Sequence, residues 1–258
     1  MLPLISSLNF NRYKNPSLIF RPKTLESSVK LFVNKFPGKV LYAVKANSSI
    51  KILKLIYQFG INSFDVASIN EVKKVRDLFS DATIFFMNPV KPRHAISMAY
   101  FNYGVKHFSL DTKEELEKII YETKYANDLS LHVRLSVPNL NSKIDLSKKF
   151  GINLKDAPKL IDQVSKIANK IGVSFHPGSQ CMDPDSYKLA IQLTGNVIKK
   201  CKNKISYLNV GGGFPSIFPG METLKLSNYF NTIQSELNKF KKNSLVFMSE
   251  PGRAIVAE

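Results

Sequence analysis

The chain has 258 residues, of which 44% are hydrophobic and 22% charged, the composition of a globular protein with one large domain or two small ones. No apolar run approaches the ~18 residues of a membrane-spanning helix, and the first residues lack the features of a secretory leader. Cys181 and Cys201 match neither a metal-binding spacing nor a disulfide framework. We therefore expect a cytoplasmic protein with no metal site and no membrane partner.

The formal net charge of +17 comes from lysines scattered along the chain, and no basic run is longer than four residues. This pattern is typical of a lysine-rich solvated surface, so we expect no nucleic-acid partner. A basic nucleic-acid-binding domain is the hypothesis that ranks last. The charge still favours anionic ligands.

Eight short apolar segments bounded by turn residues predict strands. They are residues 39–46, 62–68, 83–89, 106–111, 131–137, 173–179, 207–213 and 245–251. Apolar residues at helical spacing predict helices between them, at 49–60, 112–122, 160–171 and 228–240. This alternation predicts an α/β fold, a parallel (β/α)8 barrel of the TIM type. A long polar segment at 138–153 is expected to be an active-site loop.

Most of the predicted strands carry polar residues or glycines at their carboxyl ends, where barrels of this type place their sites. They are Lys45, Asp65, Asn88, Arg134, His176, Ser179, Gly211, Gly212, Gly213, Glu250 and Arg253. A single buried histidine is usually structural, whereas this convergence indicates a pocket. His94, His107 and His132 have no clear partners, and we interpret them as structural.

Four features of this rim suggest chemistry, and each also has a structural explanation. Desolvation lowers the pKa of a lysine, so Lys45 is a candidate nucleophile, or it simply reaches solvent. The triple glycine 211–213 offers backbone N–H groups to an anion, or makes a tight turn. Glu250 and Arg253 suit a cationic nitrogen and a phosphate, or pair with each other.

Asp65 and Arg134 come from the second and fifth predicted strands, and we expect them to pair. Glu71 follows Ser68 at capping-box spacing and is expected to cap a helix. Together, a lysine, a phosphate cradle, a carboxylate and a flat histidine describe a site for pyridoxal 5'-phosphate. The aldehyde would take Lys45, and Glu250 would keep the ring nitrogen protonated so that the ring withdraws electrons.

In sequence, the chain resembles the fold-type III pyridoxal-phosphate decarboxylases, most closely the ornithine decarboxylase branch. Alanine racemases share the fold, but their lysine motif is longer, and this chain does not continue it after YAVKAN. The matching segments cover roughly residues 16–258 in the family's order. They are YAVKAN, FDVAS, NPVK, GVKHFSLDTKEEL, VRLSV, KKFG, VSFHPGSQ, NVGGGFP and EPGR.

The resemblance implies a role for each matching residue. Lys45 matches the lysine that carries the cofactor, and His176 matches the histidine stacked on its ring. Glu250 matches the carboxylate at the pyridine nitrogen, and Asp65 with Arg134 match a supporting polar pair. The resemblance assigns the phosphate and the remaining cofactor contacts to Ser179, Gly211, Gly212, Gly213, Gly252 and Arg253.

Two departures from the family pattern accompany the resemblance. Pro177 stands where the family usually has an apolar residue, and we expect it to tilt His176. The family also continues into a C-terminal β-domain that completes the partner subunit's site, and this domain is expected to be absent here. We therefore divide the chain into residues 1–24, a segment that would join the β-domain, and residues 25–258, the cofactor-binding barrel.

The sequence thus predicts decarboxylation of a basic amino acid, with L-ornithine favoured as substrate and putrescine for polyamine synthesis as product. The resemblance implies a homodimer for the full-length form. Lysine, arginine and diaminopimelate stay open as substrates. The alternative hypothesis is a truncated or non-catalytic homologue that acts as a partner or regulator of a full-length enzyme.

Overall fold

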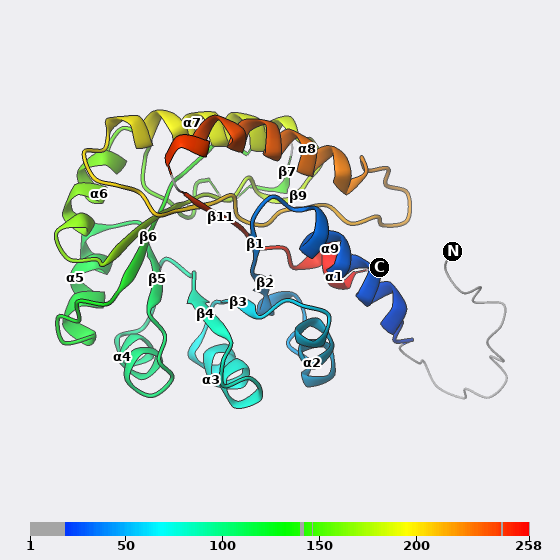
Figure 1. Cartoon of the computed structure of the whole chain (residues 1–258), viewed down its shortest axis with the longest axis horizontal. Helices are drawn as coiled ribbons and strands as arrows, with labels where there is room; N and C mark the ends of the chain where they lie inside the picture. The colour runs from blue at the N-terminus through cyan, green and yellow to red at the C-terminus, as the bar shows by residue number, and fades with distance from the viewer. Residues whose placement is uncertain (1–18, 140–141, 146, 244, 258) are drawn as a thin grey trace, which may run out of the picture.

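A parallel sheet forms the centre of the computed structural model, which describes residues 19–139, 142–145, 147–243 and 245–257 (Figure 1). Within these residues the strands follow the order β1-β11-β10-β8-β6-β5-β4-β3-β2. Their bounds are β1 Lys39–Val40, β2 Tyr42–Ala43, β3 Ser63–Val66, β4 Thr83–Phe86, β5 His107–Leu110, β6 Ser130–Arg134, β8 Lys170–Ser174, β10 Tyr207–Asn209 and β11 Val246–Ser249.

Helices surround this sheet (Figure 1). Their bounds are α1 Pro22–Lys35, α2 Ile50–Gln58, α3 Ile69–Leu78, α4 Arg93–Phe101, α5 Lys113–Glu122, α6 Ala157–Ser165, α7 Asp185–Lys200, α8 Leu226–Leu237 and α9 Arg253–Val256, with 3-10 helices η3 Val44–Ala46 and η4 Asn238–Asn243. None of the helices in the described ranges is long and apolar enough to cross a membrane. Most of the expected N-terminal segment, residues 1–18, lies outside the described residues.

The sheet closes because β1 and β2 are two parts of one segment, separated by Leu41. β1 pairs with β11, and β2 pairs with β3 at the opposite end of the strand order. Between them the Leu41 N–H donates to the Ser249 carbonyl at 2.8 Å, which continues the pairing with β11. The nine strands therefore occupy eight barrel positions, and the predicted (β/α)8 barrel is confirmed.

Local signals in the sequence explain several helix boundaries. The Ser68 hydroxyl accepts the Glu71 N–H at 3.3 Å, while the Glu71 carboxylate accepts the Ala67 N–H at 2.6 Å. This is the predicted capping box at the start of α3. Gly60, the last residue of the helix predicted at 49–60, ends α2 with a φ of +115°, a left-handed conformation that favours glycine.

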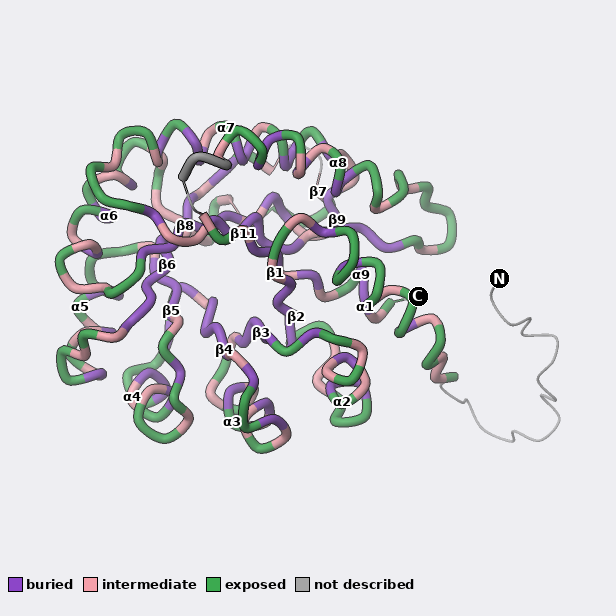
Figure 2. The backbone as a smooth tube through the Cα atoms, in the orientation of Figure 1, coloured by how far each residue is buried: buried purple, intermediate pink, exposed green. Residues whose placement is uncertain are grey.

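Most residues of the barrel strands are buried, as the purple stretches of the tube in Figure 2 show. The larger apolar cluster packs the strands against the helices, and a smaller one, comprising Leu41, Phe85, Met87 and Met248, fills the barrel interior. His107 and His132, interpreted as structural, share a hydrogen bond of 3.2 Å between Nδ1 and Nε2. Burial lowers the pKa of His107 to about 4 and holds that of His132 well below its usual range.

The predicted strand at 173–179 is only partly correct. β8 ends at Ser174, and a separate strand, β9 (Ser179–Cys181), pairs antiparallel with β7 (Ser142–Ile144) from the predicted polar loop. The chain reverses at Gly178, whose φ is +95° and where a Cβ would collide with the Ser142 side chain. The turn at Pro177 and Gly178 thus lets the polar loop pack against the segment that follows His176.

Candidate active site

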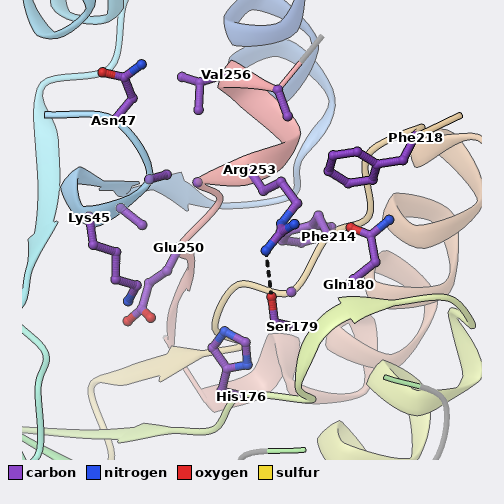
Figure 3. Close-up of a pocket in the computed structure, with 15 residues that line it drawn as sticks. Lys45, Asn47, His176, Ser179, Gln180, Phe214, Phe218, Glu250, Arg253 and Val256 are labelled. Atoms are coloured by element: carbon purple, nitrogen blue, oxygen red, sulfur yellow. Dashed lines mark hydrogen bonds between the residues drawn. The ribbon is translucent and has the colours of Figure 1, made fainter. Parts of the chain in front are cut away.

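A cavity of about 500 Å³ opens at the carboxyl ends of the barrel strands (Figure 3). Its walls come from segments far apart in the chain, the turns after β2, β8, β10 and β11. The lining residues are Ala43, Lys45, Ala46, Asn47, His176, Ser179, Gln180, Gly213, Phe214, Phe218, Glu250, Gly252, Arg253, Val256 and Ala257. Seven of the predicted site residues lie on this one cavity: Lys45, His176, Ser179, Gly213, Glu250, Gly252 and Arg253.

Lys45 stands in η3, directly after β2, and its amine lies 3.1 Å from Oδ2 of Asp65 on β3. The Asp65 side chain is only 2% exposed, whereas that of Lys45 is 57% exposed and faces the cavity. The pKa of Lys45 is raised, because attraction to Asp65 outweighs burial and Glu250 adds to it. The expectation that burial lowers this pKa is therefore wrong for the protein without cofactor.

The predicted pair between Asp65 and Arg134 is not formed, because Asp65 makes its ion pair with Lys45. The Arg134 guanidinium instead lies over the ring of Phe150, 5.0 Å from its centroid. Phe150 belongs to the KKFG segment. The Gly151 N–H beside it donates to Oδ2 of Asp111 at 2.7 Å, which fixes this segment against the barrel.

Glu250 follows β11 and points toward Lys45 in the cavity (Figure 3). Burial raises its pKa to about 7, and the nearby negative charge of Asp65 adds to this effect. One carboxylate oxygen accepts a hydrogen bond of 2.6 Å from the Asn209 amide. The side-chain oxygen Oδ1 of Asn209 in turn accepts the Gly211 N–H at 2.9 Å. One side-chain amide therefore holds both the carboxylate and the glycine turn.

His176 presents a neutral ring to the cavity. Burial holds its pKa well below the usual range, and the positive charges of Arg134 and Lys45 lower it further. Because Nδ1 accepts the Gly178 N–H at 3.1 Å, the neutral ring carries its proton on Nε2. The tilt expected from Pro177 stays a prediction.

The glycine turn after β10 depends on the absence of side chains. A Cβ at Gly211, Gly212 or Gly213 would collide with the carbonyl oxygen of Phe175, Glu250 or Gly178, respectively. The three N–H groups are not equivalent, since that of Gly211 already donates to Asn209. Of the three glycines, Gly213 lines the cavity. The predicted anion-binding site therefore has the N–H of Gly213 rather than three converging N–H groups.

Arg253 and Ser179 meet at the far side of the cavity from Lys45 (Figure 3). Nη2 of Arg253 donates to the Ser179 hydroxyl at 3.4 Å, and its guanidinium lies 5.6 Å from the centroid of the Phe218 ring. Gly252 lets this segment approach the barrel, because a Cβ there would lie 2.8 Å from that of Ala46. The alternative explanation of Glu250 and Arg253, an ion pair between them, is not found among the described residues.

Sequence reasoning missed Asn209, Phe218 and the role of Gln180. Asn209 sits two residues before the glycine triplet at the end of an apolar strand, and that position was a usable signal. Phe218 lies in a loop with no periodicity, so nothing in the sequence indicated its contact with Arg253.

Comparison with known proteins decides the family. The model described as "Pyridoxal-dependent decarboxylase, pyridoxal binding domain" matches residues 23–257. The chain belongs to the pyridoxal-dependent decarboxylases.

Three related proteins illustrate the similarity to other pyridoxal-dependent decarboxylases. A probable ornithine decarboxylase of Dictyostelium discoideum is 30% identical over 88% of this chain and 49% of its own length. Antizyme inhibitor 2 of Xenopus laevis is 33% identical over 85% of this chain and 48% of its length. The solved lysine/ornithine decarboxylase of Vibrio vulnificus, complexed with putrescine, is 27% identical, with a TM-score of 0.82 over 98% of this chain and 67% of that one. The chain spans about half the length of these two curated relatives.

The cofactor of the pyridoxal-dependent decarboxylases is pyridoxal 5'-phosphate, and the cavity fits it. An aldehyde needs an amine, which Lys45 supplies; a phosphate needs N–H groups and cations, which lie together at Gly213, Ser179 and Arg253. A basic ring nitrogen needs a carboxylate, and Glu250 lies beside Lys45 in the cavity. Burial raises the pKa of Glu250 by more than the nearby charges of Lys45 and Arg134 lower it, so a further cation beside it would be stabilising.

Proposed function

We propose that this chain forms the cofactor-binding part of a decarboxylase that acts on a basic amino acid, L-ornithine before lysine, arginine or diaminopimelate. The product from ornithine would be putrescine, which feeds polyamine synthesis. The observation that carries the proposal is the shared cavity of Lys45, Glu250 and the Ser179–Arg253 pair. Homodimeric assembly and a cytoplasmic location stay predictions from the sequence.

The proposal gives each residue a task. Lys45 would bind the cofactor aldehyde through its amine, which Asp65 holds at 3.1 Å, and the proton that the amine gives up would pass to solvent in the open cavity. The neutral ring of His176 covers one face of the cofactor. Arg253, Ser179 and the Gly213 N–H hold the phosphate. When bound, pyridoxal phosphate withdraws the electrons that remain when the substrate loses its carboxylate.

Glu250 has the task of keeping the cofactor ring nitrogen protonated. A cationic nitrogen beside it would stabilise the ionised carboxylate, and hence lower its raised pKa. Asn209 orients the carboxylate and also holds Gly211, so it couples the ring end of the site to the phosphate end.

A second candidate function is that of a non-catalytic homologue that acts on a partner protein. The match to antizyme inhibitor 2, a relative whose name is not that of an enzyme, favours it. The retention of Lys45, Glu250 and Arg253 in one cavity argues against it, because a protein that only binds a partner does not need all three.

An absorbance titration with pyridoxal phosphate tests the proposal. We expect the visible band of lysine-bound cofactor in the natural protein and in Lys54→Ala, which changes an exposed lysine on α2, and no such band in Lys45→Ala. An equal band in Lys45→Ala, or none in the natural protein, would contradict the proposed site.

The substrate is then tested by measuring the decarboxylated product from ornithine, lysine, arginine and diaminopimelate, with and without a full-length family member. Turnover of ornithine above the other three supports the first candidate. A cofactor band without turnover of any of them, combined with a changed rate of the full-length enzyme, supports the second.

A further inference from the structure

Gln180 adopts an unusual backbone conformation at the edge of the cavity. Its φ is +54°, in the left-handed region that a residue with a side chain rarely adopts. It directly follows Ser179, which binds Arg253, and its own side chain lines the cavity (Figure 3). Such a conformation persists only where surrounding contacts hold it, so the contacts of this side chain matter.

Those contacts form a clamp on the backbone of Ser216. The Gln180 amide donates from Nε2 to the Ser216 carbonyl at 2.6 Å, and its oxygen accepts the Ser216 N–H at 3.2 Å. Gln180 is 4% exposed and Ser216 is 0% exposed, so water cannot replace either bond. A buried N–H and a buried carbonyl both need partners, and one primary amide satisfies the two together.

The clamp fixes the loop that carries Phe218 to the cavity. On one side of the clamp, the Cys181 N–H donates to the Gly213 carbonyl at 2.8 Å. On the other side, two residues after Ser216, the Phe218 ring lies 5.6 Å from the Arg253 guanidinium. Two neighbours of Arg253 therefore depend on the segment around Gln180. Ser179 belongs to that segment, and Phe218 belongs to the loop that Gln180 holds.

This arrangement points to a role at one end of the cavity only. Lys45 and Glu250, at the other end, make no hydrogen bond with Gln180 or Ser216 in the described residues. The charged and hydrogen-bonding groups near Gln180 in the cavity are Ser179, Gly213 and Arg253. The proposed function assigns these groups to the phosphate.

We propose that Gln180 is a positioning residue for the phosphate of the cofactor: its amide clamp on Ser216 holds Phe218 against Arg253 and so aims the guanidinium. The inference rests on the proposed function, because that function places the phosphate beside Arg253. It predicts that Gln180 contributes to the affinity for ligands that carry the phosphate and contributes little to the affinity for those that lack it.

The test compares pyridoxal phosphate with pyridoxal, which has the same ring and aldehyde but no phosphate. Gln180→Asn keeps the amide and a residue that tolerates positive φ, but it is one methylene too short for the clamp. We expect its Kd for pyridoxal phosphate to rise about tenfold, because a displaced Arg253 would lose about one net hydrogen bond to the phosphate, and its Kd for pyridoxal to stay within about twofold. Gln192→Asn, an exposed residue of α7, is the matched control and should change neither Kd.

A second variant separates positioning from stability. Gln180→Gly removes the clamp and also relieves the backbone strain, because glycine adopts positive φ readily. Its thermal unfolding temperature without ligand should therefore be no lower than that of Gln180→Asn. It should nevertheless lose affinity for pyridoxal phosphate and not for pyridoxal.

Normal affinity for pyridoxal phosphate in both variants, or an equal loss for both ligands, would overturn the positioning role while leaving the proposed function intact. Failure of the natural protein to bind either ligand at Lys45 would instead overturn the proposed function, and the inference with it.

Discussion

Glu250 shows how a single residue can be recognised from the sequence while its behaviour depends on the fold. The carboxylate lies at the carboxyl end of the strand predicted at 245–251, and its position at the barrel rim follows from that alone. Its raised pKa comes from burial and from Asp65, which is distant in the sequence. The same applies to Lys45: the sequence predicts its place, but only the fold brings Asp65 within 3.1 Å and reverses the expected direction of its pKa.

The pKa of Glu250 predicts a pH dependence of stability. Burial raises this pKa from 4.5 to about 7, so between these pH values the folded protein binds more protons than the unfolded chain. The free energy of unfolding should therefore fall as the pH rises from 4.5 to about 7, by at most ~1.4 kcal/mol per pH unit for one proton, and this contribution should level off above.

Urea unfolding of the cofactor-free protein across this pH range measures the effect, with Glu250→Gln as the variant that cannot ionise. The difference between the two proteins should carry the slope. Parallel pH profiles would show that Glu250 does not titrate in this range.

At the scale of elements, short-range signals were predicted well and long-range docking was not. The capping box of Ser68 and Glu71 and the stop at Gly60 lie within a few residues of the helix ends they define. The strand predicted at 173–179 combined β8 with β9, because the antiparallel partner of β9 lies in the polar loop more than thirty residues earlier. No local pattern reports such a partner.

The cap of α3 gives an element-scale prediction. Replacing the Ser68 hydroxyl removes the acceptor for the Glu71 N–H, so Ser68→Ala should lower the free energy of unfolding by about 1 kcal/mol. Ser27→Ala, an exposed serine within α1, should change it by less than about 0.5 kcal/mol. Chemical denaturation measures both. An equal loss in the two variants would argue against a capping role, and the cofactor band should be unchanged in each.

At the scale of the whole molecule, the net charge of +17 should act on the approach of the cofactor. A positive field attracts a phosphorylated ligand, and salt screens that attraction over a distance of about 10 Å at 0.1 M. The association rate constant of pyridoxal phosphate, measured by stopped-flow absorbance, should therefore fall as KCl is added. Pyridoxal, without the phosphate charge, should show a weaker dependence; equal slopes for the two ligands would mean that the charge does not steer binding.

The join between β1 and β11 also sets an order of events during folding. Val40 pairs with Ser249, roughly 200 residues later in the chain, so this contact cannot form on a ribosome before β11 has been synthesised. Until then β1 and β10 each present an unpaired hydrogen-bonding edge, and such edges are where incomplete chains associate with one another. Glu250 follows β11 and Lys45 follows β2, so the two ends of the chain assemble the cofactor cavity in the step that closes the barrel. A cofactor that binds only the closed barrel would make reopening less favourable and shorten the exposure of those edges.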